Sequence, residues 1–163
     1  MIKVFIVILL FFNLLSCGPV SKATKVNKAD KPLSFVCLTS QSECEVNTKH
    51  GRFTIQFSGE PSQAYIKTEL PFYVKLKFDA KNASDQLKSI SSYLEGKNMF
   101  MGKIPVFFEN EAKQEHNLMM AESLLASCSE EIMTWLFWFN IEILVDGVVQ
   151  QQDFLIEFDS ERL

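Results

Sequence analysis

The chain contains little of what several large classes of protein require. It has two His, no block of Lys or Arg, and only six Gly and five Pro among its 163 residues. With 16 Lys plus Arg against 20 Asp plus Glu, the formal net charge is −4, so we expect no nucleic-acid partner. The length leaves room for one domain and excludes a multidomain enzyme.

The motifs of common enzyme families are also absent. The sequence contains no GxSxG, P-loop, HExxH or CxxC, and no GxGxxG after a strand. His50 and His116 are the only histidines, and nothing in the sequence connects either one to a nucleophile. We therefore expect a protein that is not an enzyme.

What the chain does contain is apolar and aromatic. Its residues are 47% hydrophobic and include fifteen Phe, which is far more than a disordered chain carries. The composition predicts a folded domain with a dense aromatic core.

The longest apolar run lies at the N-terminus. Residues 4–12 (VFIVILLFF) are all apolar and follow Lys3 closely. Because a membrane-spanning helix needs about 20 apolar residues, this run is the size of the apolar region of a signal peptide. A buried core helix is the alternative.

The sequence Leu14-Leu15-Ser16-Cys17 resembles the lipobox of bacterial lipoproteins. The resemblance implies that residues 1–16 are a signal peptide and that Cys17 becomes the lipidated first residue of the mature chain. Its acyl chains would then hold the protein on a bacterial membrane. Residue 18 is Gly and not Asp, which in a host with two membranes implies export to the outer membrane, facing the periplasm.

Two further segments follow the signal peptide. Residues 17–33 consist of Cys17 and a stretch of Lys, Ser, Thr, Asn, Pro and Ala, a composition typical of a flexible tether. Residues 34–163 carry the apolar pattern of the folded domain.

Within that domain the apolar residues recur at every second position. Residues 52–57 and 72–78 alternate in this way, which predicts half-buried strands. Residues 134–144 are apolar on much of both faces and should form a central strand. Asp146-Gly147 predicts a type I′ turn into a strand over 148–158.

Weaker patterns complete the expected fold. We expect strands near 35–38, 88–94 and 103–108, the last an edge strand or bulge because of Pro105. Residues 116–125 favour a strand, with a short helix as the alternative. Together the patterns predict an all-β fold, an antiparallel immunoglobulin-like β-sandwich of seven or eight strands.

Three cysteines remain after Cys17, namely Cys37, Cys44 and Cys128. Export makes oxidation available, and an odd number leaves at least one thiol outside an intramolecular pair. Six residues of turn-like composition separate Cys37 from Cys44, so these two are the candidate disulfide, although the other pairings stay open. Cys128 would then be a buried inert thiol or a ligand.

Soft metal ligands gather in the second half of the chain. They are Met99, Met101, His116, Met119, Met120, Cys128 and Met133. Thioether, imidazole and thiolate groups suit Cu(I), and the candidate ligand set is Met99, Met101, His116, Met119 and Cys128. The alternative is that these Met side chains pack among the many Phe of the core. The sequence requires no cofactor, and Cu(I) is the candidate.

The same region resembles a known group of domains. Its Asn98-Met99-Phe100-Met101-Gly102 segment, and the Trp-led strand that follows Cys128, are similar to the exported immunoglobulin-like domains called FixH-like or YtkA-like. The resemblance implies a β-sandwich. For members related to FixH it implies a part in copper-oxidase assembly, although those members are held by a membrane-spanning helix.

The turn around residues 93–101 also carries large apolar side chains. Exposed, they would form a patch suited to an envelope protein partner; the alternative is that the turn packs inward. We therefore expect a lipid-anchored envelope protein with a non-catalytic accessory or binding role. A Cu(I)-binding accessory protein is the alternative function.

Overall fold

The computed structural model describes residues 33–36, 43–59, 66–110 and 117–163. These residues all lie within the compact unit Pro32–Leu163. They form ten β-strands and no helix, so among them there is no helix long and apolar enough to cross a membrane.

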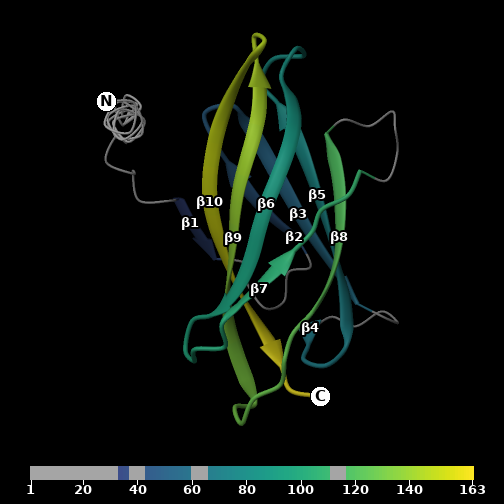
Figure 1. Cartoon of the computed structure of the whole chain (residues 1–163), viewed down its shortest axis with the longest axis vertical. Helices are drawn as coiled ribbons and strands as arrows, with labels where there is room; N and C mark the ends of the chain where they lie inside the picture. The colour runs from purple at the N-terminus through teal and green to yellow at the C-terminus, as the bar shows by residue number, and fades with distance from the viewer. Residues whose placement is uncertain (1–32, 37–42, 60–65, 111–116) are drawn as a thin grey trace, which may run out of the picture. The chain divides into compact units, whose positions relative to one another are not determined.

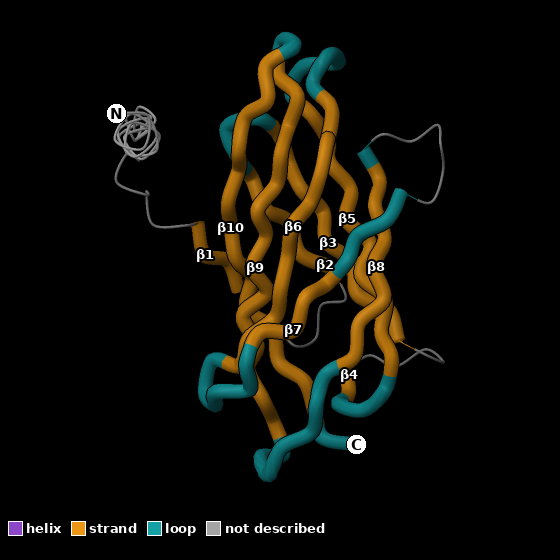
Figure 2. The backbone as a smooth tube through the Cα atoms, viewed as in Figure 1, coloured by secondary structure: helices purple, strands orange, loops and turns teal. Residues whose placement is uncertain are grey.

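The strands form two sheets that pack face to face (Figure 1, Figure 2). Sheet A has the order β1-β10-β9-β6-β7, and β4 also pairs with β10. Its strands are β1 (Leu33–Val36), β4 (Ile66–Lys67), β6 (Gln86–Gly96), β7 (Lys103–Val106), β9 (Ile132–Val145) and β10 (Val148–Glu161). Sheet B has the order β2-β3-β5-β8. Its strands are β2 (Glu43–Asn47), β3 (Gly51–Gly59), β5 (Pro71–Ala80) and β8 (Leu118–Leu124).

Sequence alternation explains which face of each strand is buried. Phe53, Ile55 and Phe57 of β3 point into the core, and the residues between them are exposed or half-buried. Strand β5 alternates in the same way, with Phe72 through Phe78 inward at every second position. Each fully buried Phe contributes about 1.5–3 kcal/mol relative to an exposed one, so the alternation itself selects the face.

Aromatic rings join the two sheets. The Phe53 ring of sheet B lies 5.2 Å from the Phe154 ring of sheet A, and Phe57 lies 5.1 Å from Phe158. The expected aromatic core is therefore the layer between the sheets.

The predicted C-terminal hairpin is confirmed. Strands β9 and β10 pair from Val145 with Val148 to Ile132 with Glu161. Asp146 and Gly147 both have positive φ, 49° and 79°, as a type I′ turn requires. Strand β9 lies between β10 and β6, which is the central place that its apolar character predicted.

The structure differs from the expected β-sandwich in its strand count and in two pairings. Ten strands are present where seven or eight were expected, because β2 has only two apolar residues and β4 only two residues in all, too few to show a clear period. Both β1 and β4 pair with β10 in parallel, so the sandwich is mostly antiparallel. Of the two alternatives for residues 116–125, the strand is confirmed, as β8. Strand β7 is an edge strand, as Pro105 predicted.

Candidate functional site

The loop between β6 and β7, residues 97–102, lies at one end of sheet A, and we call it the Met loop. Gly96 pairs with Trp135 at the end of β6, and the Lys97 backbone N–H donates a hydrogen bond to the Thr134 carbonyl oxygen at 2.9 Å. The Lys97 side chain forms an ion pair with Glu157 of β10. These three contacts fix the start of the loop to the sheet.

The Met loop folds back over Gly96. The carbonyl oxygen of Met99 occupies the space that a Cβ atom at residue 96 would need. A larger residue at position 96 would therefore force the loop to move, so the close approach requires glycine.

Side chains of the Met loop divide between the core and solvent. Met99 and Met101 are half-buried and pack against the core, whereas Phe100 between them is 96% exposed. The turn neither packs wholly inward nor exposes all its apolar residues. The Phe100 ring is exposed to solvent, and the side chains of Met99 and Met101 attach the loop to the core.

A third methionine approaches the same point from β9. A Cβ atom at Gly96 would lie 3.2 Å from Met133 Cε and 3.4 Å from Met101 Cγ, so these two side chains converge there. Met133 is 1% exposed. The sequence placed Met133 among the soft ligands but outside the candidate set, because the convergence depends on the pairing of β6 with β9.

Met119 of the candidate copper set lies elsewhere. It is buried on the inner face of β8, in sheet B. Met119 pairs with Leu76 of β5, so it belongs to the other sheet from the strands that carry the Met loop.

The other proposed ligands are placed as follows. Cys128 is half-buried with a free thiol, and its Sγ accepts a hydrogen bond from the Glu130 backbone N–H at 3.3 Å. His116 lies outside the described residues. Within the ranges that the structure describes, no three His, Cys, Asp or Glu side chains gather as a metal site.

Two of the cysteines to which the sequence assigned a role, Cys17 and Cys37, lie outside the described residues. Cys44 is disulfide-bonded, but Cys37, its predicted partner, lies outside the described residues. Cys17 and the rest of the predicted signal peptide and tether through residue 32 lie outside them as well.

Side-chain contacts on the outer face of sheet A join the strands next to the Met loop. The rings of Tyr93 and Trp138 stack with centroids 5.9 Å apart, and Lys103 Nζ lies 4.1 Å from the Tyr93 ring centroid. Trp138 Nε1 donates a hydrogen bond to Glu95 at 2.8 Å. These contacts join β7, β6 and β9 beneath the loop, so the exposed Phe100 stands on a fixed support.

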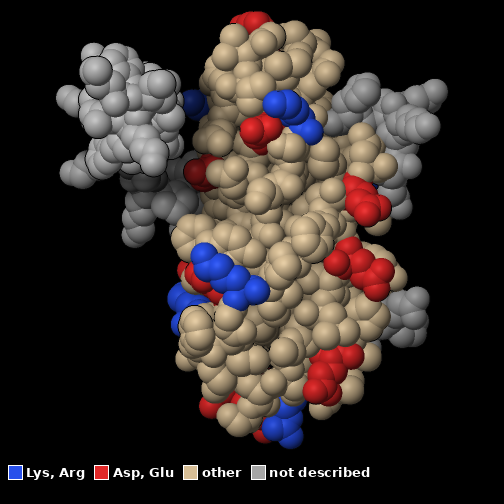
Figure 3. Space-filling model, in the orientation of Figure 1, with Lys and Arg blue, Asp and Glu red and all other residues tan. Residues whose placement is uncertain are grey.

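A second exposed aromatic residue follows β7. Phe107 is 74% exposed, while its neighbour Phe108 packs inward against Phe137 and Phe139. Phe107 borders a groove of about 450 Å³, lined by Tyr73, Phe107, Glu109, Asn110, Met120, Ala121 and Glu122. Figure 3 shows acidic side chains along the edge of the molecule where Figure 1 draws β8. Sequence reasoning missed this groove because it forms only where the segment after β7 meets β5 and β8 of sheet B.

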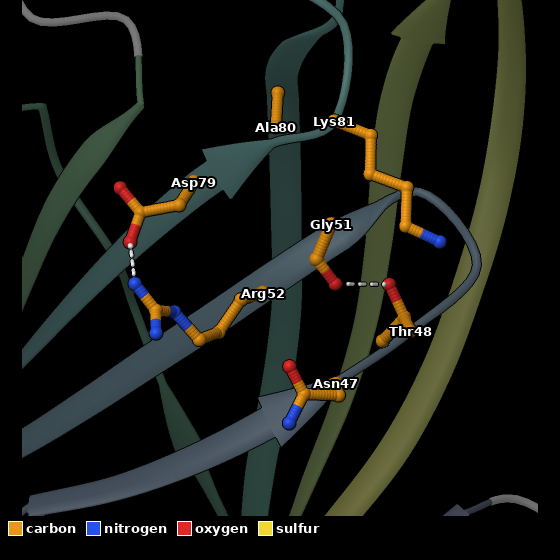
Figure 4. A pocket seen from close by; sticks show the side chains of 7 residues that line it. All are labelled: Asn47, Thr48, Gly51, Arg52, Asp79, Ala80 and Lys81. Atoms are coloured by element: carbon orange, nitrogen blue, oxygen red, sulfur yellow. Dashed lines mark hydrogen bonds and ion pairs between the residues drawn. The ribbon is translucent and has the colours of Figure 1, made fainter.

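A hollow of about 510 Å³ lies where β2 and β5 end and β3 begins (Figure 4). Its charged side chains largely neutralise each other: Arg52 lies 3.4 Å from Glu45 and 3.3 Å from Asp79. A hydrogen bond from Lys77 is the main cause that lowers the pKa of Asp79. This hollow therefore presents few groups that are free to bind a ligand.

His50, one of the two histidines, lies next to β3. It is 9% exposed, and no hydrogen-bond partner is found for its Nε2 atom in the described structure. Burial, followed by the charge of Lys49, lowers the pKa of the His50 imidazole. Among the described residues no nucleophilic side chain is hydrogen-bonded to the imidazole ring; the Thr48 hydroxyl accepts only from the His50 backbone N–H, at 3.3 Å.

Comparison with known proteins supports the fold alone. No family model and no curated protein matches the chain. A crystal structure of a DUF4785 family protein from Legionella pneumophila subsp. pneumophila str. Philadelphia 1 is similar, with a TM-score of 0.54 and 8% identity. The match covers 71% of this chain and 29% of that protein, so this chain spans less than a third of its length.

Proposed function

We propose that this protein is a lipid-anchored, non-catalytic accessory module of the bacterial cell envelope that binds a protein partner through the Met loop. The observation that carries the proposal is Phe100, a large aromatic side chain that is 96% exposed on an anchored loop. Burying such a ring in a partner contributes about 1.5–3 kcal/mol, and aromatic side chains are common at the centres of interfaces.

The anchor in this proposal is Cys17, through the resemblance of residues 14–17 to a lipobox. Cells that express the protein are labelled with radioactive palmitate, with and without globomycin, which blocks the cleavage of lipoprotein signal peptides. We expect label on the native chain, none on Cys17→Ala, and accumulation of the uncleaved form under globomycin. Normal processing with globomycin would remove the anchor from the proposal.

The partner surface is tested by site-specific photocrosslinking in intact cells. A benzoyl-phenylalanine replaces Phe100 in one variant and Val148, which is 63% exposed in another part of the chain, in the matched control. We expect one discrete adduct from position 100 and none from position 148. The adduct from position 100 should also be suppressed by coexpressing the native chain but not Phe100→Ser. Equal adducts from both positions would contradict the proposal.

Cu(I) binding is the second candidate function, and the convergence of Met101 and Met133 at Gly96 favours it. With Met99 on the same loop, three thioethers are available to a soft cation without His116 or Met119. Respiratory oxidase assembly is the role that the resemblance to FixH-like domains implies for such a site.

Anaerobic competition with bicinchoninate for Cu(I) tests this second candidate. The double variant Met99→Leu/Met101→Leu keeps the apolar volume and removes two thioethers, and Met120→Leu is the matched control on β8. We expect affinity to fall at least tenfold in the double variant and to stay unchanged in Met120→Leu. An unchanged affinity in the double variant would exclude a copper site in the Met loop.

A further inference from the structure

We propose that the groove beside Phe107 is a second docking surface, for a segment of a partner protein that presents a Lys or Arg next to an apolar side chain. The groove is separate from the Met loop and opens on the edge where the chain passes from sheet A to sheet B. We call it the Phe107 groove, with the lining residues given above.

The exposed position of Phe107 is fixed by its neighbours. Phe108 packs with its ring centroid 6.4 Å from that of Phe137 and 6.0 Å from that of Phe139. On the other side, the Glu109 N–H donates to the Met120 carbonyl oxygen at 2.7 Å, and the Met120 N–H donates back at 2.9 Å. Because adjacent residues of an extended chain point to opposite faces, Phe107 must project outward.

Apolar side chains form one part of the groove. Tyr73 of β5 and Met120 of β8 are half-buried on the outer face of sheet B, and Phe107 stands beside them. Methionine and aromatic side chains together give a surface that adapts to an apolar partner residue. An apolar side chain of the partner would lie here.

Two carboxylates decide which partner fits. Glu109 lies opposite Met120, and Glu122 is two residues farther along β8, so both carboxylates are on the same face. Diagonal neighbours of this kind have backbones about 7–8 Å apart. One cationic group placed between them would contact both.

Within the part of the chain that the structure describes, no Lys or Arg pairs with either carboxylate. Glu45, Asp79, Glu142 and Glu157 all have a Lys or Arg within 4.0 Å, whereas Glu109 and Glu122 make no ion pair within the described ranges. Lys75 of β5 lies across from Met120 and diagonal to Glu122, and within the described ranges it forms no ion pair with either glutamate. The charge of the groove is therefore complementary to a Lys or Arg side chain, which can also lie over the Phe107 ring.

Fluorescence anisotropy with defined peptides tests the proposal. The full chain, purified from its host membrane into phosphatidylcholine nanodiscs, is titrated into fluorescein-labelled Lys-Leu-Lys-Leu-Lys. The matched probes are Glu-Leu-Glu-Leu-Glu, which reverses the charge, and Lys-Ser-Lys-Ser-Lys, which removes the apolar side chains. Neutral lipid avoids attraction of the cationic probe to the membrane.

Glu109→Gln/Glu122→Gln and Phe107→Ser are the groove variants, and Glu130→Gln/Glu131→Gln removes two exposed glutamates elsewhere. We expect Glu109→Gln/Glu122→Gln to raise the Kd of Lys-Leu-Lys-Leu-Lys about twofold to thirtyfold, the range for two exposed ion pairs. Phe107→Ser should also raise this Kd, because it removes apolar contact area, and the control should leave it unchanged. Circular dichroism establishes that each variant is folded, which is expected because all four glutamates are exposed.

Three outcomes would overturn the proposal. Equal weakening by the control variant would indicate general attraction to an acidic protein. Equal affinity for Lys-Ser-Lys-Ser-Lys would mean that the apolar part of the groove is not used. Self-association of the native chain that Glu109→Gln/Glu122→Gln abolishes would identify a second copy of this chain as the occupant. A failure of Phe100 crosslinking leaves this result unaffected, because the two surfaces are tested by different variants.

Discussion

The carbonyl oxygen of Met99 lies where a Cβ atom of residue 96 would be. The Met99 backbone can approach residue 96 this closely only because Gly96 has no side chain. The obstructing atom belongs to the backbone, which cannot rotate away as a side chain can. The shape of the Met loop is therefore linked to one residue at the end of β6.

Gly96→Ala should displace the Met loop and destabilise the protein. We expect the free energy of unfolding to fall by about 1–3 kcal/mol, the usual cost of inserting a methyl group into a filled space. Urea unfolding followed by circular dichroism measures it. Ser91→Ala, on an exposed position of the same strand, is the control and should change stability by less than about 0.5 kcal/mol. Equal effects of both substitutions would mean that the close approach is not the cause.

Phe100 and Phe108 should respond oppositely to loss of the ring. Phe100 contacts little of the protein, so Phe100→Ala should leave the free energy of unfolding within about 0.5 kcal/mol of the native value. Phe108 packs against Phe137 and Phe139, and its half-buried ring should make Phe108→Ala cost about 2 kcal/mol. Thermal unfolding of both variants provides the comparison. Marked destabilisation by Phe100→Ala would give that residue a structural role and weaken its assignment to a partner surface.

The parts of the fold that sequence predicts are those in which one strand carries its own signal. The strands β3 and β5 alternate because one face is buried, and Asp146-Gly147 supplies the two positive φ angles of its turn. Strand β2 escaped prediction because only Cys44 and Val46 are apolar in it, and its place depends on pairing with β3.

The candidate sites also divide into parts with a signal in one segment and parts that depend on strand pairing. The sequence identified the Met loop, since Met99, Phe100 and Met101 are adjacent. It did not identify Met133 as a neighbour of Met101, which requires the register of β6 and β9. For the Phe107 groove a partial signal existed, because adjacent residues of an extended chain point to opposite faces, and Phe107 and Phe108 are consecutive. The two backbone hydrogen bonds between Glu109 and Met120, which complete the groove, have no local signal.

Stability should depend on pH through His50. Burial lowers its pKa in the folded state below the ordinary value of 6.5, so the unfolded chain binds a proton more readily. The free energy of unfolding should be at its full value above pH 6.5 and should fall as pH decreases from there through the folded pKa. Urea unfolding at pH 7.5 and pH 5.5 measures the difference.

His50→Gln removes the titrating group and isolates its contribution. The difference in unfolding free energy between the two pH values should be smaller in this variant than in the native chain. His116→Gln serves as the control for the other histidine. The assignment fails if His50→Gln keeps the whole pH dependence.

The hydrogen bond between Trp135 and Ser160 offers a test of the buried end of the β9–β10 hairpin. Trp135 Nε1 donates to Ser160 Oγ at 2.9 Å, and the two residues are 0% and 1% exposed. Ser160→Ala leaves the indole N–H without this acceptor in the core, so we expect a loss of about 1–3 kcal/mol. Trp135→Phe removes the donor and also leaves a cavity, so it should cost more.

The double variant Trp135→Phe/Ser160→Ala separates the hydrogen bond from the cavity. Once the donor is gone, removing the hydroxyl also removes an unsatisfied buried group, so the second substitution should cost much less than it does in the native chain. A double-mutant cycle from urea unfolding should give a coupling of about 0.5–3 kcal/mol. Strictly additive costs would show that the two groups do not stabilise the fold through this contact, and that the buried serine is accommodated in some other way.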